Sequence, residues 1–195
     1  MKQSFCFGRS RVAKRMSERV PMADGCVFCD IARRAPTSTT SLLYADDKVV
    51  AFRDINPSAF SHDSDFAAVR KLYPLEHKGS CGESGIVRHY LVIPIDHIPT
   101  VKSLQRTEDD HQLVSHMVKV GKDLLNRDAP NSEEHRFGFH QPPFNSVDHL
   151  HLHCLALPFM PSWRQVKYTP LGPLGGFIEA EKILEKINPQ AEVYS

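Results

Sequence analysis

The feature that most constrains this chain is a run of alternating histidine and leucine from His149 to His153. Strict alternation of polar and apolar residues is typical of a β-strand, because successive side chains of a strand point to opposite faces. We therefore predict a strand over residues 148–157, with His149, His151 and His153 on one face. The other, apolar face is expected to carry Leu150, Leu152, Cys154 and Leu155.

Three imidazoles spaced about 7 Å apart along one strand face can converge on one ligand. Imidazole is a nucleophile when neutral and titrates near neutral pH, so His151 at the centre suits nucleophilic catalysis. Histidines two residues apart on a strand also suit a bound zinc ion. Asn145 and Ser146, just before the run, add an amide and a hydroxyl for phosphate oxygens or a leaving group. These residues alone leave catalysis and metal binding open.

The rest of the pattern predicts an α+β domain with an antiparallel sheet of about five strands. The other strands are expected at residues 41–44, 48–54, 88–94 and 136–140. A short helical turn is expected at residues 27–32. A central helix should begin after Thr107, a capping residue followed by three acids. The buried side of a C-terminal helix is expected to consist of Phe177, Ala180, Leu184 and Ile187.

Length and composition favour one compact domain over residues 22–195. The chain has 195 residues, of which 41% are hydrophobic, and a net charge of +1. This small charge gives no general attraction to nucleic acid or membranes, and no run of about 18 apolar residues could span a bilayer. The five cysteines are an odd number, which argues against a disulfide framework and for a reducing compartment. We expect a cytoplasmic location, or a nuclear one.

Two segments differ from this domain. Residues 1–21 hold six lysines or arginines and a single acid, Glu18, and are expected to be a disordered extension or sequence upstream of a start at Met22. The alternative is a transit peptide, which would make the location organellar. Residues 60–87 lack periodicity and predict a poorly ordered insertion, either a lineage-specific loop or an intron translated in frame.

Several motifs together resemble the histidine-triad superfamily, whose signature is His-φ-His-φ-His-φ-φ with φ apolar. Residues 149–155 fit this signature at every position. Outside the insertion the similarity covers nearly all of residues 25–158, with matches at 26–29, 52–57, 89–94, 97–98 and 138–144. The last of these resembles the nucleotide-binding branch near the aprataxin group, and residues 171–181 resemble its plant members.

The resemblance implies an enzyme that acts at the α-phosphorus of an adenosine nucleotide through a nucleotidyl-histidine on His151. The carbonyl of His149 would orient the His151 ring, His153 would lie near the phosphate, and Ser146 would contact the leaving group. His89 matches a further histidine of the family's site. The implied substrates are adenosine 5'-phosphosulfate, cleaved by water or by phosphate, and AMP phosphoramidates.

The same resemblance implies a nucleotide site around Asp54, whose carboxylate would accept hydrogen bonds from both ribose hydroxyls. His140 stands near a position where many relatives carry an asparagine. With Asn145 it is expected at the phosphate or leaving group. Asp54 could instead cap a turn, and phenylalanines could be plain core. The apolar slot implied for the base consists of Val27, Phe28, Ile31, Phe52 and Ile55.

A zinc site is the implied cofactor site. Cys26 and Cys29 have a common chelating spacing, and zinc-binding relatives complete the set at positions that match His97 and His149. The implied role is structural, with no organic cofactor. A redox dithiol and a pair of buried thiols are the alternatives. The family also implies a homodimer, through the central helix and a sheet edge.

Two competing functions belong to other classes. A non-catalytic nucleotide sensor would keep Asp54 and the aromatic slot but would not need His151. Removal of adenylyl groups from DNA ends would need a basic nucleic-acid surface. The basic residues gather in residues 1–21 instead, so nucleic acid is not an expected partner.

Overall fold

A computed structural model describes residues 23–55, 88–132, 134–157, 159, 162–170 and 176–191. The expected extension at residues 1–21 and the expected insertion at residues 60–87 lie outside these ranges.

The described part of the chain is built on one antiparallel sheet of six strands in the order β1-β2-β3-β5-β4-β6. The strands are β1 Leu42–Ala45, β2 Val49–Arg53, β3 His89–Pro94, β4 His135–His140, β5 Leu152–Ala156 and β6 Phe177–Glu179. The α+β class is confirmed, and the expectation of about five strands missed β6. Phe177, assigned to the last helix from the sequence, is instead a strand residue.

Gly138 shows why a sixth strand can dock there. It pairs with Glu179 across the β4–β6 ladder. A Cβ atom at Gly138 would collide with the carbonyl oxygen of Ile178 and the ring of Phe177. Only a residue without a side chain lets β6 approach this closely. β6 has only three residues, too few for a periodic signal that a sequence pattern could detect.

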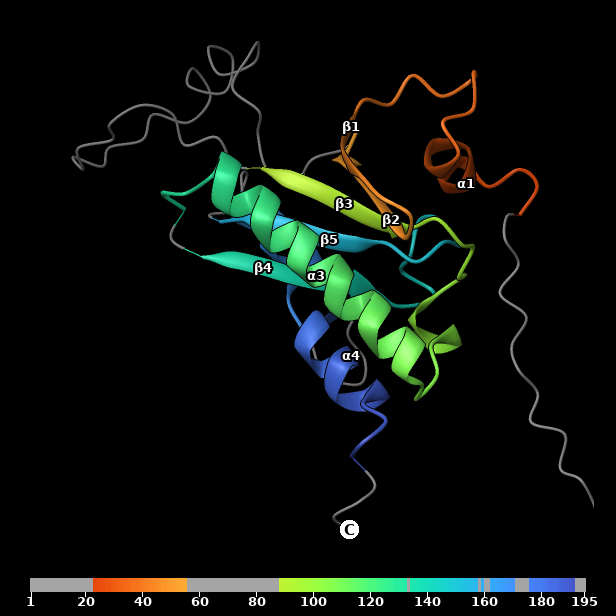
Figure 1. The fold of residues 1–195 in the computed structure, drawn as a ribbon. Coiled ribbons are helices and arrows are strands. Elements are labelled where there is room, and N and C mark those ends of the chain that lie inside the picture. The colour runs from red at the N-terminus through yellow and green to blue at the C-terminus, as the bar shows by residue number, and fades with distance from the viewer. Residues whose placement is uncertain are drawn as a thin grey trace, which may run out of the picture.

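In the described ranges, three helices and two 3₁₀ turns accompany the sheet. They are α1 Val27–Ala32, η1 Val101–Ser103, α3 Glu108–Asp128, η2 Ser162–Tyr168 and α4 Ala180–Ile187. The hydroxyl of Thr107 accepts a hydrogen bond from the amide of Asp110, so the predicted N-cap of α3 is confirmed. Figure 1 shows α3 lying across one face of the sheet, with α4 beside it and α1 at the far end near β2 and β3.

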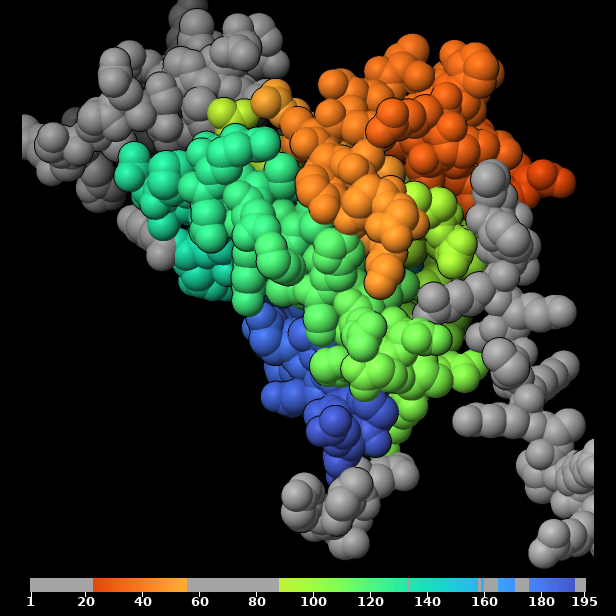
Figure 2. Space-filling model, viewed as in Figure 1, coloured from red at the N-terminus to blue at the C-terminus, as the bar shows by residue number. Residues whose placement is uncertain are grey.

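The main core lies between α3 and the sheet. Apolar residues recur along α3 at steps of three and four, and alternate residues of the strands meet them. The buried side chains of this core include Val49, Tyr90, Val92, Leu113, Met117, Val120, Leu124, Phe137, Leu152 and Cys154. In Figure 2, α3 and the β1–β2 hairpin present one continuous surface over this core. One face of the sheet is thereby closed, and the chemistry must lie on the other.

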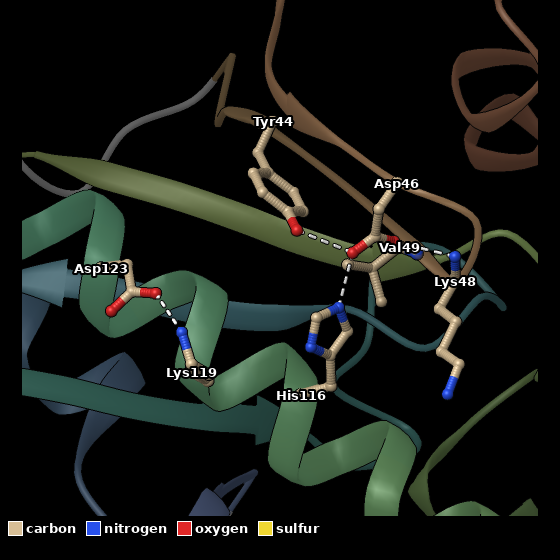
Figure 3. Close-up of polar contacts among 7 residues, drawn as sticks. All are labelled: Tyr44, Asp46, Lys48, Val49, His116, Lys119 and Asp123. Atoms are coloured by element: carbon tan, nitrogen blue, oxygen red, sulfur yellow. Dashed lines mark hydrogen bonds and ion pairs between the residues drawn. The ribbon is translucent and has the colours of Figure 1, made fainter.

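The β1–β2 hairpin is tied to α3 by the carboxylate of Asp46 (Figure 3). One of its oxygens accepts hydrogen bonds from the amides of Lys48 and Val49, at 2.8 Å each. The other accepts from the Tyr44 hydroxyl at 2.8 Å and lies 2.6 Å from Nε2 of His116 on α3. Burial raises the pKa of this carboxyl, but the four hydrogen bonds outweigh burial and hold the pKa far below its usual range.

The strand that carries the histidine run is shorter than predicted. β5 begins at Leu152, so His149 and His151 lie in the extended segment before it. Alternation still places Leu150, Leu152 and Cys154 toward α3. The prediction that Leu155 lies on that same face is wrong. Its odd position in the alternation puts it on the histidine side of the sheet, where it packs against Tyr168 and Phe177.

No helix in the described ranges is long and apolar enough to cross a membrane.

Candidate active site

The face of the sheet away from α3 gathers buried histidines from three strands and the segment before β5. They are His89 on β3, His140 on β4, His153 on β5, and His149 and His151 before β5. Two apolar groups border them: a cluster around Phe28 and Phe52 beside α1, and a cluster around Tyr168 and Phe177 beside η2. Adjacent ring centroids within the histidine group lie 4.7–5.1 Å apart.

His151 is held in one orientation by the backbone before it. Its Nδ1 lies 2.6 Å from the carbonyl oxygen of His149. A carbonyl oxygen only accepts, so Nδ1 carries the proton and Nε2 of the neutral ring bears a lone pair. Burial lowers the pKa of His151, despite the opposing effect of the His149 carbonyl. The ring is therefore neutral near pH 7, and its Nε2 has the electron pair that a nucleophile needs.

His153 belongs to a chain of hydrogen bonds that begins at Asp54. Nδ1 of His89 lies 3.3 Å from a carboxylate oxygen of Asp54, and Nε2 of His89 lies 2.9 Å from Nδ1 of His153. Burial lowers the pKa of His89 to about 4, with Asp54 acting in the opposite direction. His89 is therefore neutral at pH 7. The family resemblance implied that these three residues share one site, but it did not indicate that they contact one another in series.

His140 lies at the centre of the histidine group. Its ring centroid is 4.7 Å from that of His153 and 5.4 Å from that of Phe177. Its Nδ1 lies 3.3 Å from the carbonyl oxygen of Gly176. Burial lowers the pKa of His140 to about 4. The structure thus brings His140 next to His153, and its neutral Nε2 accepts hydrogen bonds instead of donating them.

The residues of the predicted base slot differ in their exposure. Phe28 and Phe52 meet edge to face with ring centroids 5.7 Å apart, and Phe28 lies 5.3 Å from the His151 ring. Ile31 packs with both phenylalanines. Val27 and Ile55, the other predicted members of the slot, are 52% and 93% exposed and lie outside the buried clusters of the described residues. Their apolar side chains are therefore open to a ligand, and their place in the slot stays a prediction.

The loop before His149 supplies one polar residue close to the site. Asn145 lies with His140 and His151 in the lining of a small pocket. Its amide nitrogen donates to a carboxylate oxygen of Asp148 at 2.7 Å and lies 3.4 Å from the carbonyl oxygen of Val147. Ser146 is exposed on the same loop.

A second group of ligating side chains lies at the α1 end of the histidine run. Nδ1 of His149 is 3.5 Å from Sγ of Cys26 and 3.5 Å from Sγ of Cys29, and Nδ1 of His97 is 3.4 Å from Sγ of Cys29. Nε2 of His149 lies 2.9 Å from the carbonyl oxygen of Pro94. This carbonyl fixes the proton on Nε2, so the Nδ1 lone pair faces the sulfurs.

These separations fit a tetrahedral metal. With zinc–sulfur and zinc–nitrogen bonds of about 2.3 and 2.0 Å, a tetrahedral angle puts sulfur and nitrogen about 3.5 Å apart. All four ligand atoms lie within 4.8 Å of one another. The four predicted ligands are therefore brought together from α1, the segment after β3 and the segment before β5, in an arrangement that can hold a metal ion.

Two residues near the site had no signal in the sequence. Tyr168 is fully buried, and its ring centroid lies 5.2–5.6 Å from those of His89, His140 and His153. The Nζ of Lys167, the residue before it, lies 5.6 Å from the centroid of the Tyr168 ring. They come from η2, whose short irregular turn has no periodicity, so only the tertiary structure places them here.

Comparisons with known proteins agree with this geometry. Residues 85–169 match the family described as "Scavenger mRNA decapping enzyme C-term binding". The chain is 56% identical over 164 residues to the bifunctional adenosine 5'-phosphosulfate phosphorylase/adenylylsulfatase HINT4 of Arabidopsis thaliana, a match that covers 84% of this chain and 92% of that protein. It is 37% identical to the adenosine 5'-monophosphoramidase HINT3 of Xenopus tropicalis, over 67% of each chain.

The fold is also found among solved structures. The HIT family hydrolase from Clostridium thermocellum superimposes with a TM-score of 0.50 and 24% identity, over 70% of this chain and 94% of that one. At this identity the likeness speaks for the fold alone.

Proposed function

The chain belongs to the histidine-triad family, and on that premise we propose that it is a nucleotidyl hydrolase and transferase acting on adenosine 5'-phosphosulfate. Water as acceptor gives AMP and sulfate, and phosphate as acceptor gives ADP and sulfate. The observation that carries the proposal is the 2.6 Å contact between Nδ1 of His151 and the carbonyl oxygen of His149. It leaves a buried, neutral Nε2 as the attacking atom.

The first step forms a covalent intermediate. The Nε2 lone pair of His151 attacks the α-phosphorus, the bond from phosphorus to the bridging oxygen breaks, and its electron pair leaves on sulfate. The second step reverses the roles. An oxygen of water or phosphate attacks the same phosphorus, the phosphorus–nitrogen bond breaks, and His151 regains its lone pair. The proton of the attacking water or hydrogen phosphate passes to solvent. Splitting one displacement into two in this way is the advantage of nucleophilic catalysis.

The surrounding residues have proposed roles in the same site. Asp54 binds the ribose hydroxyls, and Phe28, Ile31 and Phe52 pack against the base. Because Asp54 contacts His89, which in turn contacts His153, ribose binding at Asp54 also bears on the position of His153. His140 and Asn145 face the phosphate, and Ser146 reaches the leaving group from the loop.

A phosphoramidate is the second candidate substrate. It is favoured by the similarity to the adenosine 5'-monophosphoramidase HINT3. The same attack by His151 would release an amine or ammonia in place of sulfate. Both reactions share the adenylyl intermediate and differ only in the leaving group.

Substitution of His151 tests the mechanism. His151→Asn should lose turnover of adenosine 5'-phosphosulfate by at least about 10³-fold, as expected for loss of a nucleophile, while AMP binding by calorimetry remains. His111→Asn, on α3 across the sheet, is the matched control and should keep full activity. Unchanged turnover in His151→Asn would refute the assignment. Turnover of the phosphoramidate alone by the wild-type protein would favour the second substrate.

We also propose that Cys26, Cys29, His97 and His149 bind a structural zinc ion. Their ligand distances support it, and a bound zinc would join α1 to the histidine segment. Metal analysis of the purified protein should give one zinc per chain. Cys29→Ser should lose the zinc and lower Tm, whereas Cys154→Ala, a buried cysteine remote from the group, should keep the metal. Absence of stoichiometric zinc, with a Cys29→Ser variant of wild-type Tm, would exclude the site.

A homodimer is the proposed assembly, as the family implies. Sedimentation equilibrium should give twice the mass of the 22.1 kDa chain. A mass equal to one chain at micromolar concentration would exclude it.

A further inference from the structure

Among the described residues, three imidazole nitrogens at the centre of the site lack a hydrogen-bond partner. The Nε2 atoms of His140, His151 and His153 are buried, and no residue in the described ranges hydrogen-bonds to them. Nδ1 of His140 faces the Gly176 carbonyl and Nδ1 of His151 faces the His149 carbonyl. Both Nδ1 atoms therefore carry the proton, and both Nε2 atoms present lone pairs.

The hydrogen-bond chain from Asp54 puts the proton of His153 on Nδ1 as well. The Asp54 carboxylate accepts from Nδ1 of His89, so Nε2 of the neutral His89 ring is an acceptor. Nδ1 of His153, 2.9 Å away, must then be the donor, which leaves a lone pair on Nε2 of His153 too. All three neutral rings thus offer acceptors. Lone pairs suit an attack on phosphorus, but they repel the oxygens of a departing or arriving anion.

Lys167 is placed to supply the missing positive charge. Its ammonium lies over the ring of Tyr168, and that ring packs 5.5 Å from His153 and 5.2 Å from His140. Arg136 donates to the Tyr168 carbonyl at 3.4 Å, which anchors the end of η2. Burial is the main cause of the lowered pKa values of His140 and His153, and the positive charge of Lys167 adds to it.

We propose that Lys167 binds the anionic partner of adenylyl transfer, the departing sulfate or the incoming phosphate, and so selects oxyanion partners over uncharged amines. This inference rests on the proposed transfer through His151. The side chain of Lys167 is exposed, so its ammonium can move from the edge of Tyr168 onto a bound anion while its neighbour Tyr168 stays fixed in the protein. An ammonium provides three donors and a full charge.

The effect must depend on the leaving group. Sulfate leaves with a growing negative charge that an ammonium stabilises in the transition state, whereas an amine leaves without such charge. Because Lys167 is exposed, water screens part of this effect, and we expect about a tenfold contribution rather than the larger values of enclosed donors.

The test compares two substrates in four proteins: wild type, Lys167→Gln, Lys167→Arg and Lys122→Gln. Lys122 is the matched control, since its ammonium also lies over a ring, that of Phe137, on the α3 side of the sheet. Lys167→Gln should lower kcat/KM for adenosine 5'-phosphosulfate about tenfold and change that for adenosine 5'-phosphoramidate less than twofold. Lys167→Arg should retain most of the sulfate preference, and Lys122→Gln should match the wild type. Equal losses on both substrates, or no loss on either, would overturn the inference.

A binding experiment separates this inference from the proposed function. Inorganic sulfate, titrated by calorimetry into protein saturated with AMP, should bind the wild type about tenfold more tightly than Lys167→Gln, with no turnover required. Equal sulfate affinity in the two proteins would refute the role of Lys167 even if the enzyme acts on adenosine 5'-phosphosulfate. Weaker sulfate binding by the variant would support that role even if the physiological reaction is a different one.

Discussion

The packing of α3 on β5 allows a quantitative test at Gly121. A Cβ atom built on Gly121 would collide with Sγ of Cys154 and lie 3.3 Å from a ring carbon of Phe137. Cys154 is fully buried on β5, between His153 and Leu155. Gly121→Ala therefore forces α3 and β5 apart, or displaces the Cys154 side chain, at the strand that positions His153.

Two opposing terms set the size of the effect. Alanine in place of glycine stabilises a helix interior by about 1 kcal/mol. Overpacking a dense core by one methyl group costs about 1–3 kcal/mol. The net expectation for Gly121→Ala is destabilisation by about 0–2 kcal/mol. Cys154→Ala removes the colliding sulfur, so in the double variant the new methyl occupies the space that the sulfur leaves.

The assay is urea unfolding of the wild type, both single variants and the double variant, with ΔG from the linear extrapolation. The double variant should be more stable than the sum of the single effects predicts, by at least about 1 kcal/mol, as for residues in contact. Turnover lost in Gly121→Ala should recover in the double variant. Additivity within about 0.5 kcal/mol would refute the argument, because it would mean that the two side chains do not compete for one space.

Three further predictions follow from the same structure. Asp46→Asn should destabilise the protein by about 1–3 kcal/mol at pH 7. Because the folded pKa of Asp46 lies below its unfolded value of about 3.9, this stabilisation is present above pH 4 and is lost as the pH falls below it. In urea unfolding from pH 7 to 3, the free energies of unfolding of the wild type and the variant should therefore converge. A constant difference between them would contradict this prediction. Thr107→Ala should cost about 1 kcal/mol through loss of the N-cap, whereas Thr107→Ser should restore it; equal stability of all three proteins by thermal unfolding would exclude the cap. Ile183→Ala, at the buried face of α4, should cost about 2–4 kcal/mol while leaving the KM for nucleotide unchanged, and a raised KM would show that α4 also shapes the site.

Much of the fold could be predicted from local patterns. The steps of three and four after Thr107 gave α3, because side chains at those positions share one side of any helix. The alternation in the His149–His153 run placed the three histidines on one side of the chain, and this held although only His153 lies in the hydrogen-bonded strand. Leu155 was misassigned for the same geometric reason, since its odd position puts it on the histidine side.

The candidate site was predicted less completely, because it depends on contacts between distant segments. The family resemblance implied roles for Asp54, His89 and His153, but the series of contacts joining them depends on the β2–β3 and β3–β5 pairings. Ile55 lies beyond the end of β2 at Arg53 and is 93% exposed, an environment that its own identity does not encode.

The sequence by itself determined which residues share a face, through the fixed rotation per residue of a strand or helix, and it determined the chemical character of those faces: histidines on one side of the sheet, leucines on the other. The tertiary structure alone decided what meets these faces. It closed the leucine side with α3, brought Cys26 and Cys29 to His149, and placed Tyr168 and Lys167 beside the histidines. The physical reason is that periodicity is a property of neighbouring residues, whereas packing selects partners from the whole chain by shape, burial and charge. His151 is therefore recognisable as a candidate nucleophile from five letters of sequence, but the cation that we propose to serve its leaving group is recognisable only in the folded protein.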